Sequence, residues 1–109
     1  MTEAEVAAAL GLEAIHAGEG TREIKGIYAG DLLSRVMSHA KAGNFWVTIM
    51  ANPNVVAVAM LVDAGMVVLA EGVEPEPAAA AAAKAKGIAL YRSEKPAAEL
   101  CIAAAAAGV

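Results

Sequence analysis

The chain has 109 residues, of which 59% are hydrophobic and 18% are charged. This composition excludes intrinsic disorder, a collagen-like fibre and a polyelectrolyte tail, and the length predicts one domain spanning residues 1–109. The net charge is −4 and only 8 residues are Lys or Arg, so a phosphate backbone would find no basic cluster to bind. We therefore expect no nucleic acid partner.

The first residues are acidic, and they lack the basic segment and the apolar run of a secretory signal. A cytoplasmic location is the expectation. The span from Ala42 to Val62 carries no charge and is long enough to cross a bilayer, but Asn52-Pro53-Asn54 interrupts it. We expect two short elements there and no membrane partner.

The first half of the chain predicts two helices and three strands. Val6 and Leu10 lie four residues apart among helix-forming alanines, and Gly11 supplies a helix end. Asp31 is the expected N-cap of the second helix. The run that starts at Phe45 is β-branched and aromatic on both faces, which is typical of a central strand. In chain order, the predicted elements are a helix over Glu3–Leu10, strands over Leu12–His16 and Glu23–Tyr28, a helix over Leu32–Ala40 and a strand over Phe45–Met50.

The second half continues the alternation. Asn52 is the expected N-cap of a helix with Pro53 at its first position, and Gly65 is expected to end that helix. The predicted elements are a helix over Asn54–Ala64, a strand over Met66–Leu69, a helix over Ala78–Lys86, a strand over Ile88–Tyr91 and a last helix that begins at Ser93–Pro96 and reaches Ala107. Alternating strands and helices with short connections predict an α/β fold: a mostly parallel sheet with helices on both faces.

In such a sheet, strand C-termini and helix N-termini meet at one edge, where polar or anionic ligands bind. The simpler interpretation is that these residues are caps and turns, since Asp31, Asn52 and Ser93 each precede a predicted helix. The residues expected at this edge are Gly18, Gly20, Thr21, Gly30, Asp31, Ser34, Asn52, Asn54, Glu71, Gly72, Arg92, Ser93 and Lys95.

Motifs for metal binding, cofactor binding and catalysis are absent from the sequence. His16 and His39 have no partner at metal-ligand spacing, and the scattered glycines do not form a phosphate-binding loop. Cys101 lies in an apolar run without a basic partner, so we interpret it as a core thiol. We expect no metal, no cofactor and no enzymatic activity.

The number of apolar positions is large for so short a chain. Apolar surface left over after the core is filled usually pairs with a second copy, so a homodimer is predicted. Trp46 is interpreted as a core residue, with a ligand edge or a subunit contact as the alternative. The methionines in apolar elements are interpreted as gap-filling residues.

Three segments carry a resemblance to a known family: Gly26–Met37, Trp46–Ile49 and Asn54–Ala59. Over about residues 10 to 109 the chain resembles the DRTGG domain family, and within it the small stand-alone members, which are similar to the N-terminal domain of HPr kinase/phosphorylase. The resemblance implies an α/β fold that is often dimeric and a regulatory accessory role beside metabolic enzymes. By position it implies Gly30, Asp31, Ser34, Trp46, Thr48 and Asn54 as site residues.

Together these features predict a non-catalytic regulatory, ligand-binding or dimerisation module that senses a small anionic metabolite or a nucleotide. The alternative is a structural interaction protein that docks on a separately encoded metabolic enzyme, and a third interpretation is a small enzyme acting on a phosphorylated metabolite. The predicted ligand-binding residues are Gly30, Asp31, Ser34, Thr48, Asn52, Asn54 and Glu71.

Overall fold

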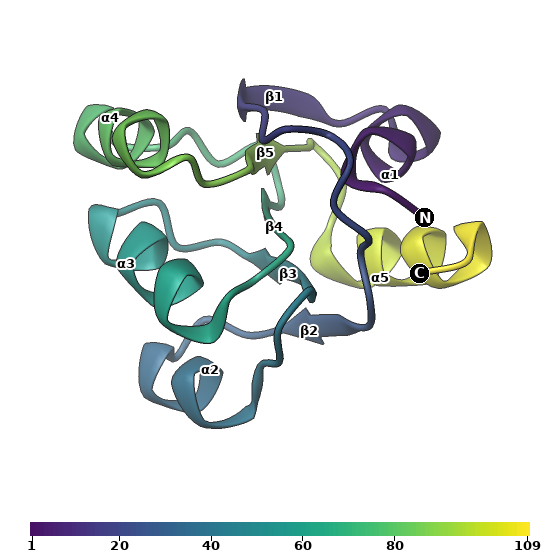
Figure 1. Ribbon diagram of the computed structural model, residues 1–109, viewed down its shortest axis with the longest axis horizontal. Coiled ribbons are helices and arrows are strands. Elements are labelled where there is room, and N and C mark those ends of the chain that lie inside the picture. The colour runs from purple at the N-terminus through teal and green to yellow at the C-terminus, as the bar shows by residue number, and fades with distance from the viewer.

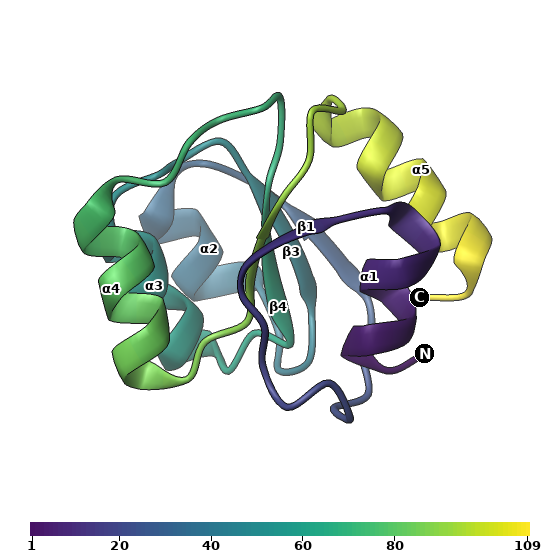
Figure 2. The ribbon, with the colours of Figure 1, turned by 90° about the horizontal axis from the view of Figure 1, so that it is seen from above.

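The computed structural model describes residues 1–109 as three layers, a five-stranded sheet between two layers of helices (Figures 1 and 2). Strands and helices alternate along most of the chain, as the sequence pattern predicts. The elements are α1 (Glu3–Leu10), β1 (Glu13–His16), β2 (Ile27–Ala29), α2 (Leu33–His39), β3 (Phe45–Thr48), α3 (Pro53–Val62), β4 (Met66–Leu69), α4 (Pro77–Lys86), β5 (Leu90–Arg92) and α5 (Ala97–Ala107).

The strand order in the sheet is β1-β5-β4-β3-β2. Strands β2 to β5 are parallel to their neighbours, and β1 alone runs antiparallel, beside β5. The predicted α/β fold with a mostly parallel sheet is confirmed. From β2 to β5 each crossover moves one strand further in the same direction, so the crossover helices α2, α3 and α4 all cover one face (Figure 1).

The two sheet faces have separate cores, because successive side chains of a strand point to opposite faces. On β3, Trp46 packs toward α2, α3 and α4, together with Val67 and Leu90 of the neighbouring strands. Phe45 and Val47 point the other way, toward α1 and α5. All four residues of β3 and all four of β4 are buried, which confirms the prediction that both are central strands.

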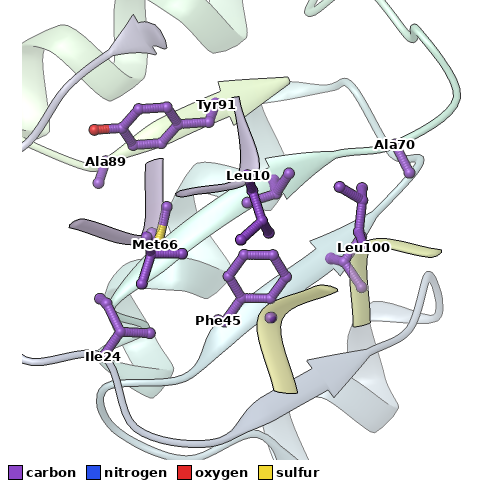
Figure 3. Packing of buried hydrophobic residues seen from close by; sticks show 12 residues of the cluster. Leu10, Ile24, Phe45, Met66, Ala70, Ala89, Tyr91 and Leu100 are labelled. Carbon is purple, nitrogen blue, oxygen red and sulfur yellow. The ribbon is translucent and has the colours of Figure 1, made fainter. Parts of the chain in front are cut away.

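Figure 3 shows the core between the sheet and the helices α1 and α5. Phe45 of β3 lies near its centre, with Leu10 of α1 on one side and Leu100 of α5 on another, and both Phe45 and Leu100 are fully buried. Tyr91 lies at the border of this cluster with its hydroxyl directed away from Leu100. Cys101 is half-buried and packs against the same cluster, and burial raises the pKa of its thiol.

Several predicted element ends differ from the structure. The second strand is shorter than predicted and lies later in the chain, because Gly26 adopts a φ of 75° and interrupts the extended run. The third helix ends before Gly65: Asp63, at a φ of 56°, takes the left-handed position and its N–H donates to the carbonyls of Ala59 and Met60. The last helix begins only after Pro96.

The uncharged span 42–62 contains β3 and α3, separated by the turn at Asn52, as predicted. No helix in the structure has the length and apolar character needed to cross a bilayer, and the longest has 11 residues. The prediction of gap-filling methionines is confirmed for Met66, which is buried. It is wrong for Met37 and Met60, which are about half exposed.

Candidate functional site

The loops after β2, β3, β4 and β5 gather at one end of the sheet, together with the N-termini of the helices that follow them. We call this end the carboxyl edge. Because β1 is antiparallel, its first residue, Glu13, pairs with Arg92 and also lies here. The loop that follows β1 lies at the opposite end, which we call the amino edge. The prediction that Gly18, Gly20 and Thr21 belong to the carboxyl edge is therefore wrong.

Asp31 ties the β2 and β3 ends of the carboxyl edge together. Its Oδ1 accepts a hydrogen bond of 2.7 Å from the hydroxyl of Thr48 and one of 2.9 Å from the N–H of Ile49. The Thr48 hydroxyl oxygen in turn accepts from the N–H of Met50 at 3.2 Å. The prediction that Asp31 caps α2 is wrong: Leu32 occupies the N-cap position without a side-chain hydrogen bond. The carboxylate serves the neighbouring strand instead.

Gly30 precedes Asp31 and contacts two aromatic side chains, Trp46 and Tyr28. The indole N–H of Trp46, a fully buried side chain, donates to the carbonyl of Gly30 at 3.0 Å. A Cβ at position 30 would come within 2.9 Å of the Tyr28 ring. Trp46 is thus a core residue whose polar end holds the first residue of the carboxyl edge in place.

The remaining predicted residues after β2 and β3 do not converge on a cavity. Asn52 caps α3 by accepting from the N–H of Asn54 at 2.9 Å, as predicted, and the side chain of Asn54 is exposed on the helix. Ser34 is exposed on α2. The gap between Asn52, Met50 and Leu69 has no room for a water molecule. This part of the edge is closed.

The turn at Glu71 and Gly72 links the loop after β4 to the loop after β5. Both residues have positive φ, 60° and 71°, and their N–H groups donate to the carbonyls of Lys95 and Ser93, each at 2.9 Å. The Glu71 side chain is exposed. The turn therefore offers no free amides to a ligand, but it holds one wall of the cavity beside β5.

That cavity has a volume of about 310 Å³ and is lined by Arg92 at the end of β5, so we call it the Arg92 cavity. The Arg92 side chain is only 12% exposed. Its guanidinium donates to the carbonyl of Gly72 at 2.7 Å and to that of Val73 at 3.4 Å. The remaining lining residues are Leu10, Gly11, Glu13, Ser93, Glu94 and Lys95.

Three carboxylates surround the same guanidinium. Glu13 lies at 2.7 Å, Glu74 at 3.1 Å and Glu94 at 3.5 Å, and their side chains are between 63% and 83% exposed. The hydrogen bond with Glu13 and the charges of these carboxylates raise the pKa of Arg92. A fixed cation thus sits among anions that can each rotate into water.

Helix α5 begins beside this cavity with no side-chain cap, because its N-cap residue is Pro96. Ser93 was expected to begin this helix, but its hydroxyl accepts from the N–H of Lys95 at 3.2 Å and forms a turn before it. The first N–H groups of α5 therefore lack partners within the helix, and they carry the partial positive charge of a helix N-terminus.

No group of three or more His, Cys, Asp or Glu side chains in the structure is arranged to hold a metal ion. Each histidine ring instead contacts a backbone carbonyl: Nδ1 of His16 lies 2.9 Å from the oxygen of Ile88, and Nδ1 of His39 lies 3.0 Å from that of Arg35.

The sequence pattern placed Arg92 at the carboxyl edge but did not single it out, and it missed Glu3 altogether. Glu3 is buried in α1 and its carboxylate accepts from Tyr91 and from two amides after β1. The available signal for Arg92 was its place as a charged residue directly after a short apolar strand. Nothing near Glu3 in the sequence distinguishes it from the exposed Glu5.

The sequence matches no protein-family model and no curated protein. Among solved structures, the fold resembles the CBS and DRTGG domains of the regulatory region of a Clostridium perfringens pyrophosphatase, whose crystal structure contains the activator diadenosine tetraphosphate. The TM-score is 0.76 at 12% sequence identity. The match covers 94% of this chain and 45% of that one, so the chain spans less than half of the structure it resembles. At this identity the likeness establishes a shared fold.

Proposed function

We propose that this protein is a DRTGG-like regulatory module that binds a small anionic ligand, a nucleotide or a phosphorylated metabolite, in the Arg92 cavity. The single observation that carries the proposal is the guanidinium of Arg92, held at the carboxyl edge by two backbone carbonyls. The fold likeness to a regulatory region crystallised with a nucleotide activator supports the same ligand class.

A phosphate group would bind by exchange. The three exposed carboxylates around Arg92 gain little from their ion pairs, because water screens them and ordering long side chains costs entropy. A phosphate offers bidentate geometry to the same guanidinium and also faces the N-terminus of α5. Lys95, exposed at the cavity wall, adds a second cation. Displacing Glu13 and Glu94 from Arg92 is the expected binding step.

The ligand-binding residues predicted from the sequence would contact only a longer ligand. Strand β2 lies three strand spacings from β5, roughly 14 Å. Asp31 and Glu71 are anionic, so this part of the edge suits the hydroxyl or amino groups of a nucleoside rather than another phosphate. We therefore propose the exposed members of this set as the surface that a nucleoside moiety reaches: Asp31, Ser34, Asn54 and Glu71. In this proposal Gly30, Thr48 and Asn52 position that surface, since the buried Thr48 donates to Asp31 and Asn52 caps the helix that carries Asn54.

The test is a calorimetric and thermal-shift comparison of inorganic phosphate, AMP, ATP and diadenosine tetraphosphate. A ligand present at one hundred times its Kd stabilises the folded state by about 2.7 kcal/mol, which is a readily measured shift. Lys95→Gln, an exposed change, should weaken binding, and the matched variant Lys84→Gln, exposed in the last turn of α4 at the opposite end of the sheet, should not. If no anion shifts the melting temperature at millimolar concentration, the proposal is wrong.

We also propose that the protein forms a homodimer through the outer surface of α3. This helix has no charged residue, and it exposes Leu61 by 73% and Met60 by 47%. Exposed apolar side chains on a charge-free helix are typical of a protein contact. Light scattering should give twice the 10.9 kDa of the single chain, and Leu61→Glu should return the monomer mass.

The second candidate function, docking on a separately encoded enzyme, would use the same surface of α3. A monomer in solution, together with the absence of any anion binding, would favour docking over the regulatory module.

A further inference from the structure

A second cavity lies at the amino edge, at the opposite end of the sheet from Arg92. Its volume is about 230 Å³, and it is enclosed by the loop after β1, the C-terminal end of α3 and the residues that precede β5. We call it the Glu3 cavity. Its charged lining residues are Glu3, Glu19, Arg22 and Asp63, and its apolar lining includes Met60, Ala64 and Ile88.

Glu3 is a buried carboxylate without a cation. Only 2% of the residue is exposed, and no Lys, Arg or His nitrogen forms an ion pair with it. The ion pairs of the chain lie on the surface or at Arg92. Its oxygens accept from the N–H of Gly18 at 2.7 Å, the N–H of Gly20 at 3.3 Å and the hydroxyl of Tyr91 at 2.7 Å. The N-terminus of α1 adds partial positive charge, but the full counter-charge is missing.

The rest of the cavity is also short of positive charge. Arg22, its one cation, is already engaged: its guanidinium donates to Oδ1 of Asp63 at 2.8 Å and to the carbonyl oxygen of Asp63 at 2.9 Å. Glu19 is exposed and forms no ion pair. In addition, α3 and α4 end at the cavity wall, at Asp63 and Gly87, so their carbonyl ends turn negative partial charge toward it.

From this arrangement we infer that the Glu3 cavity binds a small organic cation, a primary ammonium group on a short apolar stem. The ammonium donates to the carboxylates of Glu3 and Glu19, while the stem lies against Met60 and Ile88. A volume of about 230 Å³ is far more than the roughly 10–15 Å³ that one water molecule needs, so the cavity has room for a short amine.

Other ligand classes fit this cavity less well. An anion would meet Glu3, Glu19 and Asp63 with only one cation to offset them. A bare divalent metal ion needs carboxylates close enough to coordinate it together, and the acidic side chains here are not so arranged. An ammonium with an apolar stem makes separate hydrogen bonds and uses the apolar wall. This site is independent of the Arg92 cavity and of the anion binding proposed there, and it shares Met60 with the surface of α3 proposed for the homodimer.

The experiment is a titration of isotope-labelled protein with n-butylamine and putrescine, followed by NMR, with butanol and butyrate as controls of the same stem. Both amines should shift the amide signals of Gly18 and Gly20, and the alcohol and the acid should not. A lysine residue blocked at both termini forms a further arm. If this bulky derivative binds more weakly than butylamine, the ligand is a free amine. If it binds equally well or more tightly, the ligand is the lysine side chain of another protein, and the free amine proposed here is wrong.

One variant of the cavity and one control variant test the role of the Glu19 carboxylate, and both change exposed side chains. Glu19→Gln removes an exposed charge and should weaken amine binding about two- to five-fold, the effect expected of one exposed ion pair. Glu99→Gln, an exposed carboxylate on α5, is the matched control and should leave it unchanged. The inference is overturned if butanol binds as well as butylamine, if neither amine binds at ten millimolar, or if the two variants behave alike.

Discussion

The two cavities lie at opposite ends of the parallel strands and hold their buried charges in different ways. Arg92 is surrounded by carboxylates that are largely exposed, and each can leave without moving the backbone. Glu3 is held by two backbone N–H groups and a buried tyrosine hydroxyl, which cannot leave without moving a loop or a strand. At Arg92 a ligand can therefore take the place of a carboxylate. At Glu3 a ligand can only bind in addition to the three donors already present.

This difference explains the opposite ligand charges proposed for the two ends. At the Arg92 cavity an incoming anion replaces anions, so the local charge changes little. At the Glu3 cavity an incoming cation adds the counter-charge that the fold omits. Three helix termini favour the same assignment, because α5 begins at the first cavity whereas α3 and α4 end at the second. Helix α1 has the opposite polarity, since it begins at Glu3 and ends at Gly11 beside Arg92.

The largest effect should come from removing the buried carboxylate. Glu3→Ala leaves the N–H of Gly18 and the hydroxyl of Tyr91 without an acceptor in a buried site, and each unsatisfied group costs about 1–3 kcal/mol. We expect a loss of about 3 kcal/mol in the free energy of unfolding, measured by urea denaturation. Glu99→Ala, at an exposed position, should change it by less than about 0.5 kcal/mol. Equal effects of the two variants would mean that Glu3 is not held as described.

A pair of glycine variants separates the fixed carboxylate from a movable one. A Cβ at Gly18 would overlap Oε1 of Glu3, and a Cβ at Gly72 would overlap Oε2 of Glu94. Glu94 can rotate into water, so Gly72→Ala should cost only the strain of its positive φ, about 1 kcal/mol. Gly18 has no such strain, yet Gly18→Ala should cost about 1–3 kcal/mol, because Glu3 cannot retreat. Thermal unfolding of both variants decides this, and a negligible loss at Gly18 would contradict the comparison.

The smallest effect concerns alkaline pH. Burial raises the pKa of Tyr91, and the hydrogen bond and the charge of Glu3 raise it further. Since the unfolded tyrosine has a pKa near 10, the stability that Tyr91 contributes is complete below about pH 10 and is lost as the pH rises beyond it. Tyr91→Phe should be about 1 kcal/mol less stable than the native protein at pH 8. This difference in the free energy of unfolding should shrink above about pH 10 in urea titrations. A difference that stays constant with pH would contradict a raised pKa of the Tyr91 hydroxyl.

The sequence predicted the fold well because its signals are local. The cap at Asn52 acts on Asn54, two residues away, and the left-handed end at Gly11 acts on the preceding turn. The apolar runs at Phe45–Thr48 and Met66–Leu69 indicated strands buried on both faces, and both are. The error at Asp31 occurred where a distant partner replaced a local one: Asp31 had the position of an N-cap, but its carboxylate accepts from the hydroxyl of Thr48 and from the N–H of Ile49, at the end of the next strand.

The candidate sites, in contrast to the fold, were predicted poorly from the sequence. Residues of the β2 and β3 ends were predicted from helix starts and from the family resemblance, and the structure closes that part of the edge with internal hydrogen bonds. The two cavities instead depend on the position of β1. Its antiparallel direction brings Glu13 to Arg92 and sends the glycines of the following loop to Glu3. No periodicity distinguishes a parallel from an antiparallel edge strand of four residues.

By itself, the sequence determined which segments are helices, which are buried strands and how they alternate, because propensity, capping and apolar periodicity act over a few residues. Only the tertiary structure decided which charges are buried and what faces them. Asp31 and Thr48 are separated by 17 positions, and Glu3 and Tyr91 by 88. Such pairs form when the sheet brings their strands and helices together, and the energy of a buried charge depends on those distant partners rather than on its neighbours in the chain.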